Sequence, residues 1–222
     1  MKKKVFLTLM ALVAFAGAAQ AATLVNGTFD ELSSDYTGLV NGYALDAIPG
    51  SSWDVYASIP GWTTTNGEGI EIQKSTIVQA QSGDYYVELD SHPGPDSNSS
   101  MAQTGYVDAG DYVLSFFYQP RTNNGNDDNG IAVYFDDFLA LEVSARTGDW
   151  DPAGWHEYTL PFTIDASGIH TLTFAAYGDE NTYGGFLDTV SISGPTTPPV
   201  PEPASIALFG LGLLGVFARK RK

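Results

Sequence analysis

The central part of the chain is a series of short runs rich in β-branched and aromatic residues, separated by clusters of Gly, Asn, Asp and Pro. Within these runs apolar residues recur at every second position, as at Tyr112, Leu114, Phe116 and Tyr118. A period of two places alternate side chains on one face of a strand, so each run can bury one face against a core. No window of this region has the period of a helix. The pattern therefore predicts an all-β fold.

The same runs predict where the strands lie. They are expected over residues 24–29, 52–56, 61–65, 70–73, 85–89, 101–107, 112–118, 131–135, 138–143, 155–162, 169–176 and 186–193. Eight or more short strands of this kind, joined by close turns, are typical of two packed antiparallel sheets. We therefore predict a jelly-roll β-sandwich over residues 22–194.

The N-terminal end is an addressing segment. Lys2, Lys3 and Lys4 precede an apolar stretch, and residues 19–21 read Ala-Gln-Ala, the small-x-small form of a cleavage site. We predict a secretory signal peptide over residues 1–21, with an uncleaved anchor as the alternative. The chain contains no cysteine, so an exported domain would have neither disulfides nor thiol chemistry.

The C-terminal end has the composition of a membrane segment. Residues 195–203 are rich in Pro and Thr and predict a stiff spacer. Residues 204–218 carry no charge, and as a helix they would be about 22 Å long, short of a bilayer core of about 30 Å but able to span it with local thinning. The four residues that follow, 219–222, are all basic and would stay in the cytoplasm. We expect one transmembrane helix with the domain outside.

The tail as a whole resembles the PEP-CTERM sorting signal of Gram-negative bacteria. The resemblance lies in Pro201, Glu202 and Pro203, the apolar run, and the basic end Arg219, Lys220, Arg221 and Lys222. It implies processing by an exosortase-type enzyme, and delivery to the envelope or secreted matrix after transient anchoring in the inner membrane. A plain single-span anchor is the alternative, and retention or cleavage of the tail stays open.

Without its two ends the chain is strongly acidic. Residues 22–194 contain 25 Asp and Glu against three basic residues, Lys74, Arg121 and Arg146, which gives a net charge of −22. This field repels phosphate backbones and anionic lipid, which argues against nucleic acid and the membrane surface as partners of the domain. Carboxylates do suit hard cations such as Ca²⁺, although solubility alone also explains most of the charge.

Three stretches of the domain carry a second resemblance. They are LVNGTFDE at 24–31, SGDYYVELDS at 82–91 with MAQTG at 101–105 and GDYVLSFFYQPR at 110–121, and TYGGFLDTVSI at 182–192. Together they look like the galactose-binding-like jelly rolls, which include carbohydrate-binding modules and a related family of plant cell walls and PEP-CTERM proteins. The resemblance implies a structural calcium ion between the first and last strands, at Asn26, Asp30 and Asp188. The alternative is that Asp30 ends a strand and Asp188 binds a backbone amide.

The run NNGNDDNG at 123–130 is a weaker calcium candidate. With Gly130 at the invariant glycine of an EF-hand, the first ligand position falls on Gly125, which has no side-chain oxygen. We predict a hairpin loop between strands here.

Sugar-binding surfaces use aromatic rings, because the C–H faces of sugars stack on them. The candidates are Trp53, Trp62, Trp150 and Trp155 and the loop tyrosines Tyr36, Tyr43 and Tyr183. Trp62, Trp150 and Tyr183 lie in turns and are the predicted ligand-binding residues, with burial in the core as the alternative for each. Trp155 opens a strand and is expected in the core.

No residue set indicates an enzyme. The HExxH and GxSxG motifs are absent, and His92, His156 and His170 lie in unrelated contexts. With so many carboxylates, no pair stands out as that of a glycosidase. We expect no catalytic residues and a protein that binds extracellular polysaccharide in the envelope or biofilm matrix. The alternatives are a structural matrix protein without specific sugar binding and, less favoured, a glycoside-active enzyme, which would need a deep cleft and a carboxyl of raised pKa.

Overall fold

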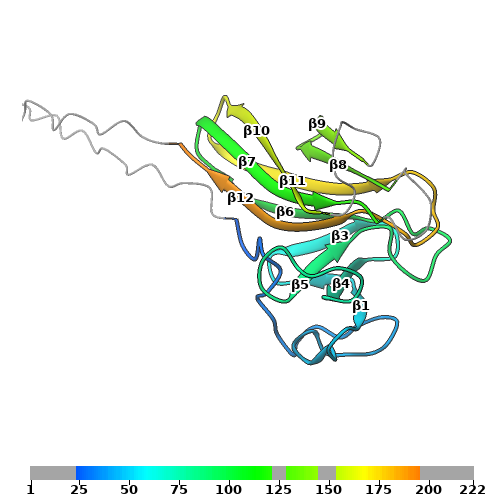
Figure 1. Cartoon of the computed structure of the whole chain (residues 1–222). Helices are drawn as coiled ribbons and strands as arrows, with labels where there is room; N and C mark the ends of the chain where they lie inside the picture. The colour runs from blue at the N-terminus through cyan, green and yellow to red at the C-terminus, as the bar shows by residue number, and fades with distance from the viewer. Residues whose placement is uncertain (1–23, 122–128, 145–153, 196–222) are drawn as a thin grey trace, which may run out of the picture.

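The computed structural model describes residues 24–121, 129–144 and 154–195 (Figure 1). These residues form two antiparallel sheets and one short 3-10 helix, η1 (Leu45–Ala47). The first sheet contains, in spatial order, β1 (Trp53–Tyr56), β4 (Ile70–Lys74), β5 (Tyr85–Glu88), β12 (Phe186–Ser193), β7 (Gly110–Gln119) and β10 (His156–Ile164). The second contains β2 (Ser58–Ile59), β3 (Trp62–Asn66), β6 (Ser100–Val107), β11 (Gly168–Tyr177), β8 (Gly130–Phe135) and β9 (Phe138–Val143).

The winding of the chain is that of a jelly roll. From β5 to β12 successive strands alternate between the two sheets, except for the hairpin of β8 and β9. The order β5-β12-β7-β10 thereby packs against β6-β11-β8-β9, which is the arrangement of two interlocked Greek keys. The four earlier strands extend both sheets on one side. The predicted all-β jelly-roll sandwich is confirmed.

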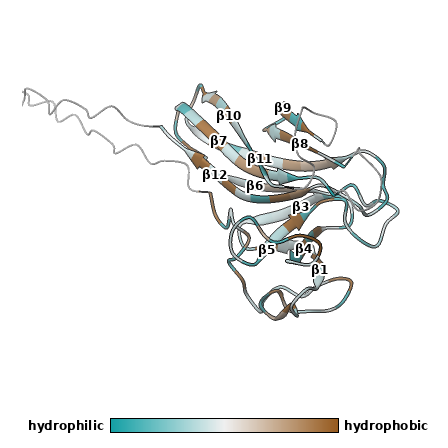
Figure 2. Cartoon of the chain, viewed as in Figure 1, coloured by the Kyte–Doolittle hydropathy of each residue, from teal (hydrophilic) through white to brown (hydrophobic). Residues whose placement is uncertain are grey.

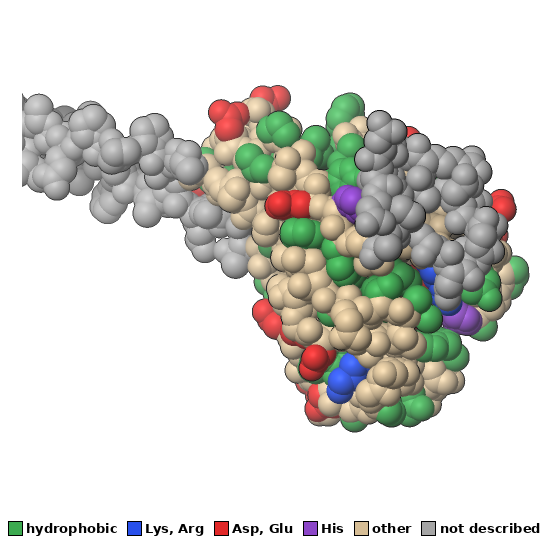
Figure 3. All heavy atoms as spheres, viewed as in Figure 1, with side chains coloured by type: hydrophobic (Ala, Val, Ile, Leu, Met, Phe, Trp, Pro, Cys, Tyr) green, Lys and Arg blue, Asp and Glu red, His purple; other side chains and the backbone are tan. Residues whose placement is uncertain are grey.

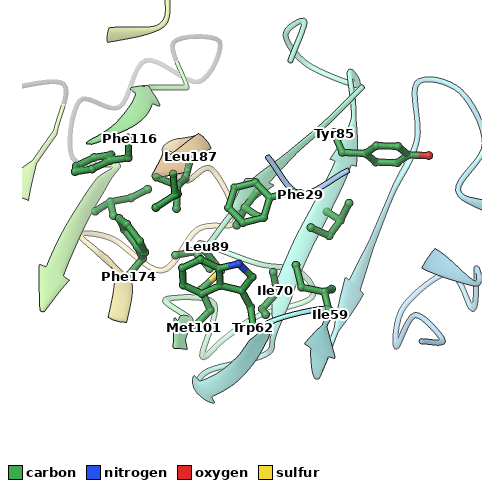
Figure 4. Close-up of a cluster of buried hydrophobic side chains, with 14 of the residues drawn as sticks. Phe29, Ile59, Trp62, Ile70, Tyr85, Leu89, Met101, Phe116, Phe174 and Leu187 are labelled. Atoms are coloured by element: carbon green, nitrogen blue, oxygen red, sulfur yellow. The ribbon is translucent and has the colours of Figure 1, made fainter. Parts of the chain in front are cut away.

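The core lies between the sheets, on the inward positions of the alternating runs. Tyr112, Leu114, Phe116 and Tyr118 are all buried, as their alternation predicted. Trp62 lies near the middle of the cluster in Figure 4, with its ring centroid 6.1 Å from that of Phe29 and 5.9 Å from that of Phe174. Strands of both sheets show the corresponding alternation of hydropathy (Figure 2).

Every expected strand after the first is present, with ends that agree to within two residues. The strand expected over residues 24–29 is wrong. Asn26 and Phe29 have φ values of 51° and 60°, in the left-handed region, and the Phe29 N–H donates to the Asn26 carbonyl. The Asn-Gly pair at 26–27 thus makes a turn where the apolar flanks favoured a strand.

Two further expectations concern connections and ends. The loop at 123–130 cannot be a hairpin, because β7 and β8 lie in different sheets and the chain crosses between them there. No helix in the described part of the chain is long and apolar enough to cross a bilayer. The predicted signal peptide, most of the spacer, the transmembrane segment and the basic tail lie outside the described residues.

Candidate functional site

Two buried carboxylates lie side by side on the outward face of the first sheet. Glu71 of β4 and Glu88 of β5 are opposite each other in the register, and neither is exposed. The side-chain amide of Gln73 donates to Glu71 Oε1 at 2.9 Å and also to Glu88 Oε2. Buried carboxylates are costly unless they are paired and hydrogen-bonded. The other hydrogen-bond partners of Glu71 and Glu88 therefore determine what this region can do.

Arg121, just after β7, neutralises Glu88. Its Nη1 donates to the two Glu88 oxygens at 2.9 and 3.1 Å and to the Thr182 carbonyl at 3.2 Å. The Gly184 N–H donates to Glu88 Oε1 at 2.7 Å. Burial, reinforced by the charge of Glu71, raises the pKa of Glu88 well above its usual range, and Arg121 opposes this rise. The ion pair thus fastens the β11–β12 loop to the ends of β5 and β7.

Glu71 holds an aromatic pair at the surface. Its Oε2 atom accepts the backbone N–H of His92 at 3.0 Å and lies 2.9 Å from His92 Nδ1. The imidazole stacks on Trp53, with centroids 4.4 Å apart and planes at 29°. Both rings are partly exposed, so they present an aromatic surface directly above a buried charge.

Tyr183 provides a second aromatic surface. Its ring is 40% exposed and lies over the Arg121 guanidinium, 4.4 Å from centroid to carbon. Its N–H donates to Asp90 Oδ2 at 3.0 Å, whereas the buried Asp90 Oδ1 has no hydrogen-bond partner among the described residues. The set Trp53, Glu71, Glu88, His92, Arg121 and Tyr183 is called the loop-end cluster below.

The two glycines after Tyr183 are required by close packing. A Cβ atom on Gly184 would lie 2.7 Å from Asp90 Cβ, and one on Gly185 would lie 2.3 Å from the Tyr118 ring. The Gly-Gly pair lets the loop press against the strand ends, which brings the Gly184 N–H to Glu88.

The predicted metal residues Asp30 and Asp188 converge on one loop, residues 81–84. Asp188 Oδ2 accepts the N–H groups of Gln81 and Ser82 at 2.9 and 3.1 Å, and its Oδ1 accepts that of Thr189 at 2.6 Å. Asp30 Oδ1 accepts the Asp84 N–H at 3.0 Å. Burial raises the pKa of Asp188 to about 6, and the charge of Asp30 adds to the effect.

These residues fit a calcium ion only in part. The two carboxylates meet as expected, but each already accepts backbone N–H groups, as the metal-free alternative requires. The Asn26 side chain accepts the Glu31 N–H and donates to the Pro60 carbonyl. These bonds stabilise the turn in which Asn26 lies. Among the described residues, no group of three or more His, Cys, Asp or Glu side chains could hold a metal ion. Calcium at Asn26, Asp30 and Asp188 stays a prediction.

The predicted ligand-binding residues have three different outcomes. Trp62 is only 1% exposed and its indole N–H donates to the Asn26 carbonyl at 3.1 Å, so it belongs to the core and the prediction is wrong. Tyr183 is exposed in the loop-end cluster, and its role stays a prediction. Trp150 lies outside the described residues. Trp155, expected in the core, is instead partly exposed on the outward face of the first sheet, where its ring packs edge-on against Tyr86 with centroids 5.8 Å apart; that expectation is wrong.

The predicted sorting residues also lie outside the described residues, but the sequence comparison covers them. They are Pro201, Glu202, Pro203, Arg219, Lys220, Arg221 and Lys222. Residues 199–222 match the family model described as the PEP-CTERM protein-sorting motif. The chain carries a PEP-CTERM sorting motif. It implies processing by an exosortase and export to the envelope, as the residues predicted. No curated protein matches the chain.

Solved structures similar to this chain include several carbohydrate-binding modules. TmCBM61, in complex with beta-1,4-galactotriose, is 20% identical with a TM-score of 0.41, over 60% of this chain and 88% of that one. CBM35 from Paenibacillus barcinonensis is 20% identical with a TM-score of 0.39, over 61% and 94%. The Stig cyclase Fisc from Fischerella sp. TAU is 15% identical with a TM-score of 0.48, over 79% and 97%. At these identities the similarity is one of fold alone.

Proposed function

We propose that this chain is an exported, non-catalytic protein that binds extracellular polysaccharide through the loop-end cluster. The observation that carries the proposal is the exposed Tyr183 ring held on Arg121, which is itself fixed by the buried Glu88. A sugar presents C–H faces that stack on aromatic rings and hydroxyls that need polar partners at fixed positions. An aromatic ring over a charged, hydrogen-bonded base offers both.

Buried hydrogen bonds support the cluster, which favours binding. Tyr183 and the Trp53–His92 pair are supported from below by Glu88 and Glu71, which are neighbours across β4 and β5. Side chains locked by buried hydrogen bonds lose little conformational entropy when a ligand arrives. The two aromatic surfaces thus form a preorganised platform at one end of the sandwich.

The geometry of the loop-end cluster does not favour catalysis. Glu88 has the raised pKa that a general acid needs, but it is fully buried and its oxygens accept from Arg121, Gly184 and Gln73. A general acid must come within hydrogen-bond reach of the substrate. We infer that Glu88 positions the Tyr183 loop and donates no proton.

The charge of the domain restricts the polysaccharide. A net charge of −22 over residues 22–194 repels uronate- or sulfate-rich chains, so neutral or amine-bearing polysaccharides are the proposed ligands. Because the sorting motif directs the protein to the envelope, we place this binding in the envelope or biofilm matrix.

The test is a pull-down of residues 22–194 on the extracellular polysaccharide of the producing organism, first with calcium and then with a chelator. Saturable retention supports the proposal, and its loss in chelator would add the structural calcium ion. A folded domain that is not retained under either condition would contradict sugar binding and leave the second candidate, a structural matrix protein.

A further inference from the structure

A groove of about 610 Å³ opens at the side of the sandwich where β9 and β10 are the outermost strands. Its apolar lining includes Phe135, Phe138, Ala140, Leu160, Phe162 and Ile164. It lies near the β8–β9 turn and the C-terminal half of β10, at the end of the molecule opposite the loop-end cluster. It is therefore separate from the proposed sugar-binding surface.

The groove exists because the two sheets are not joined at this side. Phe135 of β8 and Phe162 of β10 meet across the gap, with ring centroids 4.0 Å apart. Beyond them Phe138 is left 73% exposed and Leu139 42% exposed. Apolar residues colour this edge in Figure 2. Clustered exposure of large apolar side chains is uncommon on soluble proteins and marks interaction sites.

The polar part of the lining is negative. Asp136, Asp165 and His170 line the groove. Asp136 Oδ2 lies 2.9 Å from His170 Nδ1, and Asp136 Oδ1 accepts the Thr171 N–H. The hydrogen bond lowers the pKa of Asp136 and raises that of His170, which favours the ionised pair. The Asp165 carboxylate then adds an excess negative charge.

No Lys or Arg offsets this charge in the described lining of the groove. Near β9 and β10, Figure 3 shows apolar and acidic side chains and a histidine, but no Lys or Arg among the described atoms of this face. An apolar body would gain from leaving water here, whereas an anionic group would be repelled. A cationic group beside the carboxylates would be attracted.

We propose that this groove binds an amphiphile with an apolar body and one ammonium group. The apolar body lies along Phe135, Phe162 and Leu160, and the ammonium lies beside Asp136 and Asp165. The volume is within the range of about 300–1,000 Å³ that small-molecule sites occupy. Charge complementarity selects this occupant over an anion of equal size.

The test uses octyltrimethylammonium and octyl sulfate, kept below their critical micelle concentrations, in calorimetric titrations of residues 22–194. The buried core cluster of the described residues runs from Phe29 to Val190, within this unit, and a cooperative thermal transition verifies the fold. We expect octyltrimethylammonium to bind at one site and octyl sulfate to bind at least about tenfold more weakly. Equal binding of the two probes would overturn the proposal.

Two matched pairs of variants locate the probe. Phe138→Ala should weaken octyltrimethylammonium binding about fivefold or more, whereas Ile169→Ala, which removes a side chain 67% exposed but outside the lining, should leave it unchanged. Asp165→Asn should weaken it more than Asp46→Asn, which removes the same charge elsewhere. If both members of either pair had equal effects, the binding would be non-specific and the proposal wrong.

The same measurements distinguish two other possible occupants of the groove. The C-terminal residues 204–222 have the same chemistry, an apolar run and four basic residues. If the full chain failed to bind octyltrimethylammonium while residues 22–194 bound it, the tail would be the occupant and the proposal would be overturned. If the domain dimerised with rising concentration and the probe dissociated the dimer, a second copy of the chain would be the occupant of the groove instead. Tyr183→Ala should leave probe binding unchanged, which separates this test from that of the sugar-binding proposal.

Discussion

The edge formed by β1 and β2 is covered by the chain segment that precedes β1, whereas the edge formed by β9 and β10 has no such cover among the described residues. The loop that immediately precedes β1 lies beside that strand in Figure 1, and three side chains of residues 24–52, Phe29, Leu45 and Ile48, belong to the buried core. At the other edge Phe138 faces solvent. The two edges of one sandwich thus differ: one is closed by core side chains, and the other is open where we propose that a ligand binds.

One buried carboxylate accepts several of the hydrogen bonds that attach the covering segment to β1; others include the one from the Leu39 N–H to the Val55 carbonyl at 2.8 Å. Asp54 of β1 accepts the N–H groups of Val40, Asn41, Tyr43 and Val55 at 2.8–3.0 Å. Gly38 lies so close that a Cβ atom there would be 1.9 Å from Asp54 Oδ2. Backbone donors of the irregular segment thus converge on this one side chain, in addition to the bond between Leu39 and Val55. An edge can be closed in this way without adding a strand.

The largest effect is expected from Phe29→Ala at the covered edge. Phe29 is 1% exposed and packs on Trp62, so the cavity should lower the free energy of unfolding by about 3–5 kcal/mol. Urea denaturation of residues 22–194 measures the change. A loss below about 1 kcal/mol would show that the N-terminal segment is not part of the cooperative core.

Asp30 of the N-terminal segment and Asp188 of β12 meet at residues 81–84, and the stability of this contact should depend on pH. Burial raises the pKa of Asp188 to about 6, so the folded protein holds this proton more tightly than the unfolded chain does. Its stabilising contribution is therefore complete below about pH 4 and is lost as the pH rises through about 6, an effect of about 3 kcal/mol. Calcium between Asp30 and Asp188 would lower this pKa and remove the loss.

Unfolding measured from pH 4 to pH 8 tests this link, in chelator and in calcium, for the natural protein and for Asp188→Asn. The variant should lack the part of the pH dependence that Asp188 supplies, while the buried Glu88 contributes equally to both proteins. Identical pH profiles for the two proteins would contradict the assignment. Stabilisation by calcium of the natural protein alone would support the predicted metal site.

Asp54→Asn should cost about 2 kcal/mol. The substitution keeps the size of the side chain but replaces one acceptor oxygen by a donor that faces backbone N–H groups. The matched control is Asp46→Asn, an exposed aspartate of the same segment, which should change the free energy of unfolding by less than about 0.5 kcal/mol. Equal effects of the two variants would contradict the fastening role of Asp54.

The smallest effect is expected at the open edge. Phe138→Ala removes a ring that is mostly in water, so the free energy of unfolding should change by less than about 0.5 kcal/mol. The same urea denaturation measures it beside Phe29→Ala. A loss comparable to that of Phe29→Ala would mean that the β9–β10 edge is as closed as the β1–β2 edge, and the comparison would fail.

Sequence pattern predicted the regular part of the fold and missed the irregular part. Strand β7 could be read from its alternating side chains, because a period of two is a local property. The covering segment has no period, because it is held by separate hydrogen bonds, several of them to Asp54, and by side chains that enter the core one at a time. Trp62 was misplaced for a related reason: the Pro-Gly before it does form a turn, but that turn directs the indole inward from β3.

The candidate site was predictable only where it depended on composition. Tyr183 was identified because it is an aromatic residue in a glycine-rich turn. Glu71 and Glu88 are 17 positions apart in sequence and become neighbours only through the register of β4 and β5. The available indication was an acidic residue within each of two otherwise apolar strands, IEI at 70–72 and YYVEL at 85–89, which costs energy without a partner.

The most direct test of the proposed function compares two exposed tyrosines at opposite ends of the sandwich. Tyr183 belongs to the loop-end cluster, and Tyr106, which is 59% exposed, lies near the β6–β7 turn. Binding isotherms on the extracellular polysaccharide should show about tenfold or greater weakening for Tyr183→Ala, and affinity equal to that of the natural protein for Tyr106→Ala. If the two variants bound equally well, or lost binding equally, the loop-end cluster would not be the polysaccharide-binding surface.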